Sequence, residues 1–152
     1  MKTQDLTILL VEDDPNDVIL IKRAFQKNGL INPIKVVSNG EEAIQYLEGK
    51  GPFSDRARYP IPILILLDLK MPKMSGFEFL KWVRAHPKYK KIIVVILTSS
   101  RESPDINRAY ELGANSFLVK PVEFTDLIRL VKELHLYWIL LNEPPKIFDT
   151  GD

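Results

Sequence analysis

Five polar residues of this chain lie where short apolar runs end. They are Glu12, Asp13, Asp68, Thr98 and Lys120. The clearest run is Ile-Leu-Ile-Leu-Leu at 63–67, which ends at Asp68 and lies between prolines. Such a run is typical of a strand buried on both faces of a parallel sheet. Ligands bind outside the carboxyl ends of such strands, so Asp68 is placed to meet a ligand, although a loop cap is the alternative.

The chemistry open to this set is phosphoryl transfer assisted by a metal ion. Three clustered carboxylates repel one another and need a cation, and an oxygen site with few protein ligands suits Mg²⁺. A lysine can bind one phosphoryl oxygen and a threonine hydroxyl another, while a carboxylate can itself become an acyl phosphate. The alternative makes each acid a cap and Lys120 a solvated charge. Five coincidences at strand ends favour a site.

The elements that would position these residues alternate along the chain. Apolar runs predict strands at 6–11, 34–37, 63–67, 92–97 and 116–119. Helical spacing predicts helices beginning near Pro15, Gly40, Gly76, Ser103 and Thr125, the last running to about Leu141. Five strands alternating with five helices predict an α/β fold of parallel βαβ units, with right-handed crossovers and helices on both faces.

Local signals refine these predictions. An N-cap residue followed by proline predicts helix starts at Asp14 and Ser103. The segment 51–62 has no clear periodicity and is predicted to be a surface loop in which Arg56 is solvated. His135 is predicted to face solvent on the last helix.

Composition excludes several classes of function. The 152 residues contain no cysteine, which excludes disulfides, thiolate metal sites and thiol catalysis, and two histidines cannot make a histidine-rich metal site. A net charge of +1 gives no overall case for binding nucleic acid or an anionic membrane. With no signal-peptide pattern and no apolar run of bilayer length, we expect a cytoplasmic protein that does not bind membranes.

The end of the chain bears on partners. A single domain is expected over 1–142, followed by an irregular tail at 143–152. Because that tail is too short for a DNA-binding module, no output domain is expected, and output would pass through protein contacts. The last helix is apolar nearly all round, so either the tail covers it or it forms an interface with a second copy or a kinase.

Four motifs resemble the receiver domain of bacterial two-component response regulators. They are Leu10-Val11-Glu12-Asp13-Asp14, Leu67-Asp68-Leu69-Lys70-Met71-Pro72 with Ser75-Gly76, Leu97-Thr98-Ser99, and Lys120-Pro121. The resemblance covers about 6–141 and implies a flavodoxin-like doubly wound (βα)5 fold with a five-stranded parallel sheet in the order 2-1-3-4-5. The segments 51–62 and 136–142 are more narrowly similar to single-domain regulators that partner phytochrome-type histidine kinases.

The resemblance implies a metal site and a phospho-acceptor. Asp68 would accept the phosphoryl group. Asp13 and Asp68 would bind Mg²⁺, with Glu12 acting largely through water and the backbone carbonyl of Lys70 as a further ligand.

The resemblance also implies a switch. Lys120 would bind the phosphoryl group, and its bond to Pro121 would be cis. Thr98 would move to bond a phosphoryl oxygen while the ring of Phe117, at the family's aromatic switch position, turns inward. Ser99 would influence access to the acyl phosphate.

The resemblance implies a phosphorylation-dependent signalling switch that accepts its phosphoryl group from a sensor histidine kinase. The narrower resemblance implies that this kinase is phytochrome-like. The chain would catalyse only its own phosphotransfer and dephosphorylation, and a homodimer would use the fourth helix, fifth strand and fifth helix.

One alternative function is an unphosphorylated pseudo-receiver scaffold. Another is an aspartyl-nucleophile phosphohydrolase, although the commonest such family has an acid where this chain has Lys70. A flavin or nucleotide module would need a glycine- or hydroxyl-rich phosphate loop after the first strand, where this chain has Glu12-Asp13-Asp14.

Overall fold

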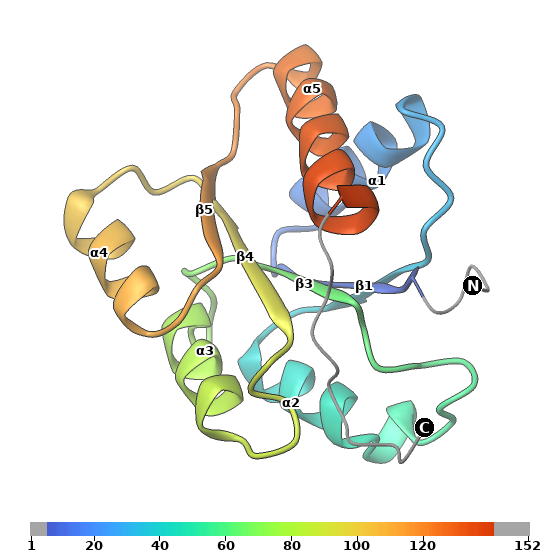
Figure 1. The fold of residues 1–152 in the computed structure, drawn as a ribbon, viewed down its shortest axis with the longest axis vertical. Helices are drawn as coiled ribbons and strands as arrows, with labels where there is room; N and C mark the ends of the chain where they lie inside the picture. Colours follow the sequence, from blue (N-terminus) through green and yellow to red (C-terminus); the bar gives the residue numbers. More distant parts are fainter. Residues whose placement is uncertain (1–5, 142–152) are drawn as a thin grey trace.

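A computed structural model describes residues 6–141 as one five-stranded parallel sheet with helices on both sides (Figure 1). The strands are β1 (Ile8–Val11), β2 (Ile34–Val37), β3 (Leu64–Leu67), β4 (Ile93–Thr98) and β5 (Ser116–Val119). Their order is β2-β1-β3-β4-β5, so the predicted flavodoxin-like fold is confirmed. The tail predicted at 143–152 lies outside the described residues.

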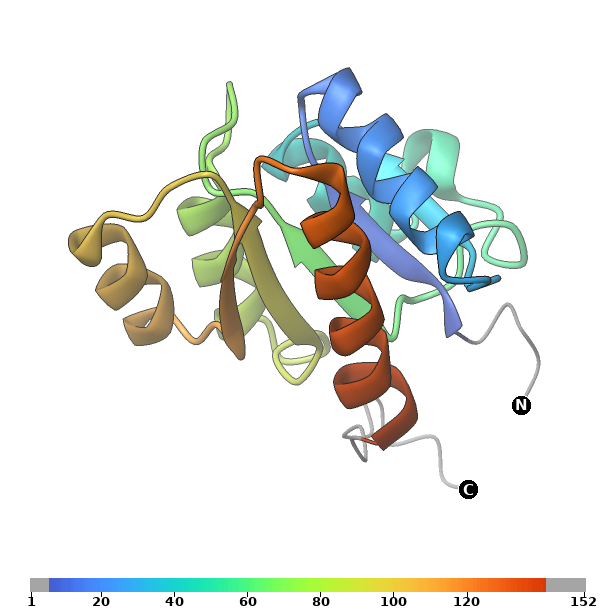
Figure 2. The same ribbon diagram turned by 90° about the horizontal axis from the view of Figure 1, so that it is seen from above.

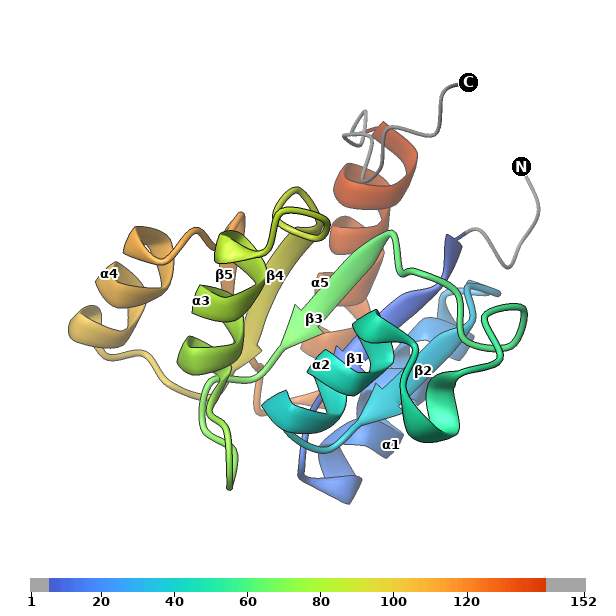
Figure 3. The same cartoon turned by 90° about the horizontal axis from the view of Figure 1, so that it is seen from below.

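The helices divide between the two faces of the sheet. They are α1 (Pro15–Lys27), α2 (Gly40–Glu48), η2 (Gly51–Phe53), α3 (Gly76–Ala85), α4 (Ser103–Glu111), α5 (Phe124–His135) and η3 (Leu136–Leu141). α1 and α5 cover one face (Figure 2), and α2, α3 and α4 cover the other (Figure 3). A separate apolar cluster joins each set of helices to the sheet. The central strands β1, β3 and β4 are therefore buried on both faces, which explains their unbroken apolar sequences. Among residues 6–141, none of the helices combines the length and the apolar character that a bilayer crossing needs.

Most helix starts follow from local sequence. The side chain of Asp14 accepts a hydrogen bond from the Asn16 amide at 2.9 Å, as predicted for an N-cap. The prediction for Ser103 is wrong by one residue, because Glu102 occupies the N-cap of α4 and makes no side-chain cap hydrogen bond. Proline is tolerated at either of the first two helical positions, so Pro104 does not fix the register.

The segment 51–62 is anchored rather than solvated. Arg56 donates hydrogen bonds to backbone carbonyls at the end of α2, including that of Tyr46 at 2.6 Å. The rings of Tyr46, Phe53 and Tyr59 pack against one another with centroids 5.2–5.9 Å apart. The prediction of a solvated Arg56 is therefore wrong, because its guanidinium satisfies helix-end carbonyls that would otherwise need water.

The last helix changes character near its end. It does not run unbroken to Leu141, because the α-helix ends at His135 and the wider π-helical η3 follows. The imidazole of His135 lies 3.0 Å from the side-chain oxygen of Asn32, and burial lowers the pKa of His135. The prediction that His135 faces solvent is therefore wrong.

Candidate functional site

The carboxyl ends of the strands meet at one edge of the sheet, as their parallel register requires. Val11 pairs with Leu67 across β1 and β3, so the residues that follow them, Glu12 and Asp68, are neighbours. The amide of Asp68 donates to the carbonyl of Val11 at 3.0 Å. At β4 and β5, the amide of Lys120 donates to the carbonyl oxygen of the last β4 residue at 2.7 Å. Backbone hydrogen bonds therefore fix the points from which the site side chains extend.

Three carboxylates gather at this edge. Glu12, Asp13 and Asp68 each offer an oxygen atom, and these oxygens all lie within 4.8 Å of one another. Glu12 and Asp68 are buried, whereas Asp13 is exposed to solvent. A set of oxygen donors that is open on one side fits Mg²⁺, which keeps several waters when it binds protein carboxylates.

Lys120 supplies the one ammonium group that contacts these acids among the described residues. Its Nζ donates to a carboxylate oxygen of Glu12 and to Oδ2 of Asp17 at 2.8 Å, and lies 3.7 Å from Oδ2 of Asp68. Its side chain is only 13% exposed. Burial lowers the pKa of Lys120, but the hydrogen bonds to Asp17 and Glu12 and the charge of Asp68 outweigh burial and raise it above its usual value.

Glu12 carries the electrostatic consequence of this crowding. Burial raises the pKa of Glu12 to about 7, although the hydrogen bond from Lys120 acts in the opposite direction. The neighbouring charge of Asp68 raises it further. One lysine therefore leaves this group of carboxylates short of positive charge, which is the condition under which a divalent cation binds well.

The backbone after Asp68 is held by a tight loop. Oδ1 of Asp68 accepts a hydrogen bond from the Leu69 amide at 2.8 Å, and the Gly76 amide donates to the carbonyl of Leu69 at 2.9 Å. The first residue of α3 thus packs directly on the chain that follows Asp68. Lys70 lies in the same loop with its side chain exposed, and the role of its carbonyl as a metal ligand stays a prediction.

The structure places the two switch candidates on adjacent strands. Thr98 ends β4 and is 1% exposed, so its hydroxyl lies at the buried side of the same edge. Phe117 on β5 is half-buried and packs against the cluster beneath α2, α3 and α4. The prediction of a cis bond between Lys120 and Pro121 is wrong, because every peptide bond within residues 6–141 is trans, the isomer that X–Pro bonds also favour.

Sequence reasoning missed Asp17 as part of the site. An acid in the first turn of a helix is ordinarily explained by the positive end of the helix dipole. The structure shows that it also binds Lys120 from the first turn of α1. The sequence feature that could have indicated this contact is an acid in the first turn of the helix that follows Glu12 and Asp13.

A second network that the sequence did not reveal joins the loops after β3 and β4. The hydroxyl of Ser100 donates to Oδ2 of Asp105 at 2.6 Å and accepts from the Glu102 amide at 3.4 Å. The same oxygen of Asp105 lies 3.8 Å from the ammonium of Lys70. The loop that follows Asp68 is therefore linked to the first turn of α4.

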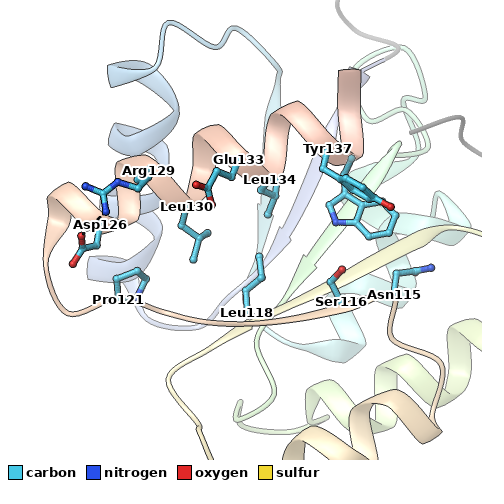
Figure 4. A pocket seen from close by; sticks show the side chains of 11 residues that line it. Asn115, Ser116, Leu118, Pro121, Asp126, Arg129, Leu130, Glu133, Leu134 and Tyr137 are labelled. Carbon is cyan, nitrogen blue, oxygen red and sulfur yellow. Dashed lines mark ion pairs between the residues drawn. The ribbon is translucent and has the colours of Figure 1, made fainter. Parts of the chain in front are cut away.

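A groove of about 540 Å³ lies between β5 and α5 (Figure 4). Leu118, Leu130 and Leu134 give it an apolar floor. Tyr137 stands at one end, and at the other end Arg129 pairs with its helix neighbour Asp126 at 3.6 Å. Since β5 is an edge strand, this groove opens onto the side of the sheet that has no further strand.

Known proteins are similar to this chain in both sequence and fold. The family described as "Response regulator receiver domain" matches residues 8–132. The probable methanogenesis regulatory protein FilR2 of Methanothrix harundinacea is 39% identical over 141 residues, which cover 91% of this chain and 86% of FilR2. Response regulator Rcp1 of Synechocystis sp. is 33% identical over 132 residues, which cover 87% of this chain and 88% of Rcp1.

Solved structures agree with this result. The Mn²⁺-bound form of Rcp1 has a TM-score of 0.82 and 32% identity, covering 93% of this chain and 99% of that one. The phosphorylated cyanobacterial phytochrome response regulator RcpA has a TM-score of 0.85 and 33% identity, with the same coverage of 93% and 99%. The predicted relationship to phytochrome response regulators is confirmed at the level of these relatives.

Proposed function

The chain belongs to the response regulator receiver domain family, and from this premise we propose that Asp68 accepts a phosphoryl group from a sensor histidine kinase. The observation that carries the proposal is the position of Asp68, which lies in a cluster of three carboxylates with an ammonium 3.7 Å away. An oxygen of Asp68 would attack phosphorus while the P–N bond of the kinase phosphohistidine breaks. The electron pair of that bond returns to the imidazole, and an acyl phosphate forms.

Glu12, Asp13 and Asp68 are the proposed holders of Mg²⁺, with Glu12 acting largely through water and the carbonyl of Lys70 completing the protein ligands. Their oxygen-only chemistry and close spacing support this assignment, as does the Mn²⁺-bound form of Rcp1. When bound, the ion would neutralise charge on the phosphoryl oxygens. The protein itself holds these carboxylates at the strand ends. There Asp68 lies close to the proposed Mg²⁺ site and to the ammonium of Lys120.

The proposed switch uses Lys120 and Thr98. The ammonium of Lys120 would bind one phosphoryl oxygen and the hydroxyl of Thr98 another, and both contacts exist only when Asp68 carries the group. Such differential contacts shift a population between two states. The loop after Thr98 leads through Ser100 to α4, so we propose that the shift reaches α4 and the ring of Phe117 on β5 by this path.

The proposed partners are a phytochrome-type histidine kinase and a second copy of this chain. The kinase assignment is supported by the description of RcpA as a phytochrome response regulator. The dimer would use α4, β5 and α5. Tyr110 on α4 is half-exposed, as are Leu136 and Tyr137 in η3, directly after α5. Exposed aromatic and aliphatic side chains of this kind are typical of protein interfaces. Signal output would then pass through protein contacts of the receiver itself.

A phosphotransfer assay tests the function. A purified phytochrome-type histidine kinase is autophosphorylated with labelled phosphate and mixed with this chain and Mg²⁺. We expect the label to move to the wild-type chain and to Asp55→Asn, a control on the surface of the loop 51–62, and not to Asp68→Asn. Equal labelling of wild type and Asp68→Asn would contradict the proposal.

A further inference from the structure

Lys120 rests between two acids, and neither of them is Asp68. One N–H of its ammonium donates to Glu12 and a second donates to Asp17 at 2.8 Å. Oδ2 of Asp68 lies 3.7 Å away, which is an ion pair but is beyond hydrogen-bond distance. The resting position of this cation is therefore set by the residue that follows β1 and by the first turn of α1.

The start of α1 fixes the position of Asp17. It lies in the first turn of α1, whose start is fixed by the Asp14 cap and Pro15. Its carboxylate side chain is 32% exposed and lies outside the three-carboxylate cluster. It therefore contacts the ammonium from a separate element of the fold.

The position of Lys120 matters because two cations serve the same carboxylates. An ammonium that moved onto Asp68 would neutralise an oxygen that a divalent ion needs, and would repel that ion. A third acid that holds the ammonium at a distance leaves Asp68 and Asp13 available to the metal. Lys120 nevertheless stays close enough to reach a phosphoryl group on Asp68.

We propose that Asp17 is a positioning residue that holds the ammonium of Lys120 away from Asp68 and so keeps the acidic cluster open to a divalent cation. This inference rests on the proposed function, because it takes the cluster to be the Mg²⁺ site. Asp17 acts only through Lys120 and touches neither Asp68 nor Asp13 in this role. Asp17 thus lies outside the three-carboxylate cluster, and its effect on Mg²⁺ binding depends on Lys120.

A double-mutant cycle separates this role from simple loss of charge. Mg²⁺ binding is measured by titration calorimetry on the unphosphorylated full chain at one pH, for wild type, Asp17→Asn, Lys120→Met and the double variant. With Lys120 present, we expect Asp17→Asn to weaken Mg²⁺ binding about tenfold, because the freed ammonium moves toward Asp68. With Lys120→Met, the same change should cost about threefold or less, which is its through-space charge alone.

Asp14→Asn is the matched control. It removes a charge beside Asp13 while keeping a side-chain oxygen for the α1 cap. Among the described residues, the acids that contact the ammonium of Lys120 are Glu12, Asp17 and Asp68, and Asp14 is not one of them. We expect it to weaken Mg²⁺ binding about threefold or less. Thermal unfolding of each variant checks that the fold is kept.

The outcomes distinguish the two proposals. An equal loss for Asp17→Asn with and without Lys120, or no loss at all, overturns the positioning role while leaving the proposed function intact. An equal loss for Asp14→Asn and Asp17→Asn overturns it too. A wild-type chain that binds no Mg²⁺ overturns both the positioning role and the proposed metal site.

Discussion

Gly76 shows how closely the backbone packs around Asp68. A methyl group added to Gly76 would overlap the carbonyl oxygen of Asp68 and lie 2.8 Å from the Cα of Leu69. Neither of these backbone atoms can move without displacing the proposed phospho-acceptor. The Ser-Gly pair that begins α3 is thus a steric requirement of the site as well as a helix start.

We expect Gly76→Ala to lower the free energy of unfolding by about 2 kcal/mol or more and to weaken Mg²⁺ binding, because the clash falls on backbone. Urea unfolding and titration calorimetry measure the two effects. Gly40→Ala is the matched control, since it also begins a helix but meets the flexible side chain of Met74. Equal costs for the two substitutions would contradict the steric account.

The strand-end residues could be predicted from sequence, and their neighbours could not. Asp68, Thr98 and Lys120 follow apolar runs, and parallel register brings such positions to one edge whatever the details of packing. The contact of Asp17 with Lys120 depends on how α1 is rotated against the sheet. The hydrogen bond between Ser100 and Asp105 depends on the path of a single loop. The periodicity of apolar residues in the sequence predicts neither contact.

Arg84 joins three elements that are separate in sequence. From the end of α3 its guanidinium donates to the carbonyls of Ile92 and Gly113, at 2.7 and 2.8 Å, and to the side chain of Asn115 at 2.8 Å. Asn115 in turn accepts from the Val94 amide at 2.8 Å. One planar side chain therefore fixes the spacing of α3, β4 and β5.

We expect Arg84→Met to lower the free energy of unfolding by about 2–4 kcal/mol, because several partly buried acceptors lose a charged donor. Arg84→Lys should recover little of this, since an ammonium cannot reproduce the fork. Urea unfolding measures both, with Lys81→Met on the exposed face of α3 as the control. A loss for Arg84→Met no larger than for Lys81→Met would contradict this role.

Helices and strands were predictable where local rules decide them. Unbroken apolar runs predict the buried strands, and the side chain of Asp14 followed by Pro15 predicts the N-cap of α1. The anchored Arg56 and the bond between His135 and Asn32 depend on long-range contacts, so both were missed. The π-helical end of the last helix was missed for the same reason, because Trp138 and Ile139 pack on the cluster beneath α1 and α5.

The whole molecule presents two candidate functional surfaces. The acidic cluster lies at the carboxyl edge of the sheet, whereas Tyr137 lies in η3, directly after α5, at the other end of the groove in Figure 4 from Pro121. The proposed phosphorylation site and the proposed interface therefore lie on separate surfaces of one fold. A substitution at either surface should leave the chemistry of the other measurable.

We expect Tyr137→Asp to convert a dimer to a monomer, because it places a charge in the proposed interface. Analytical ultracentrifugation measures the state, and the rate of phosphoryl adduct formation on Asp68 should stay within about twofold of wild type. Ile19→Asp is the control, since Ile19 is similarly exposed but lies on α1. A wild-type monomer, or a Tyr137→Asp dimer, would contradict the proposed interface.

The central claim is that Asp68 is phosphorylated with the help of a divalent cation, and intact mass tests it most directly. The full chain is incubated with acetyl phosphate, with and without Mg²⁺, beside Asp68→Asn. The account predicts a single phosphoryl adduct on the wild-type chain in the presence of Mg²⁺ and none in either other case. An adduct that persists in Asp68→Asn, or that forms equally well without a divalent cation, would contradict it.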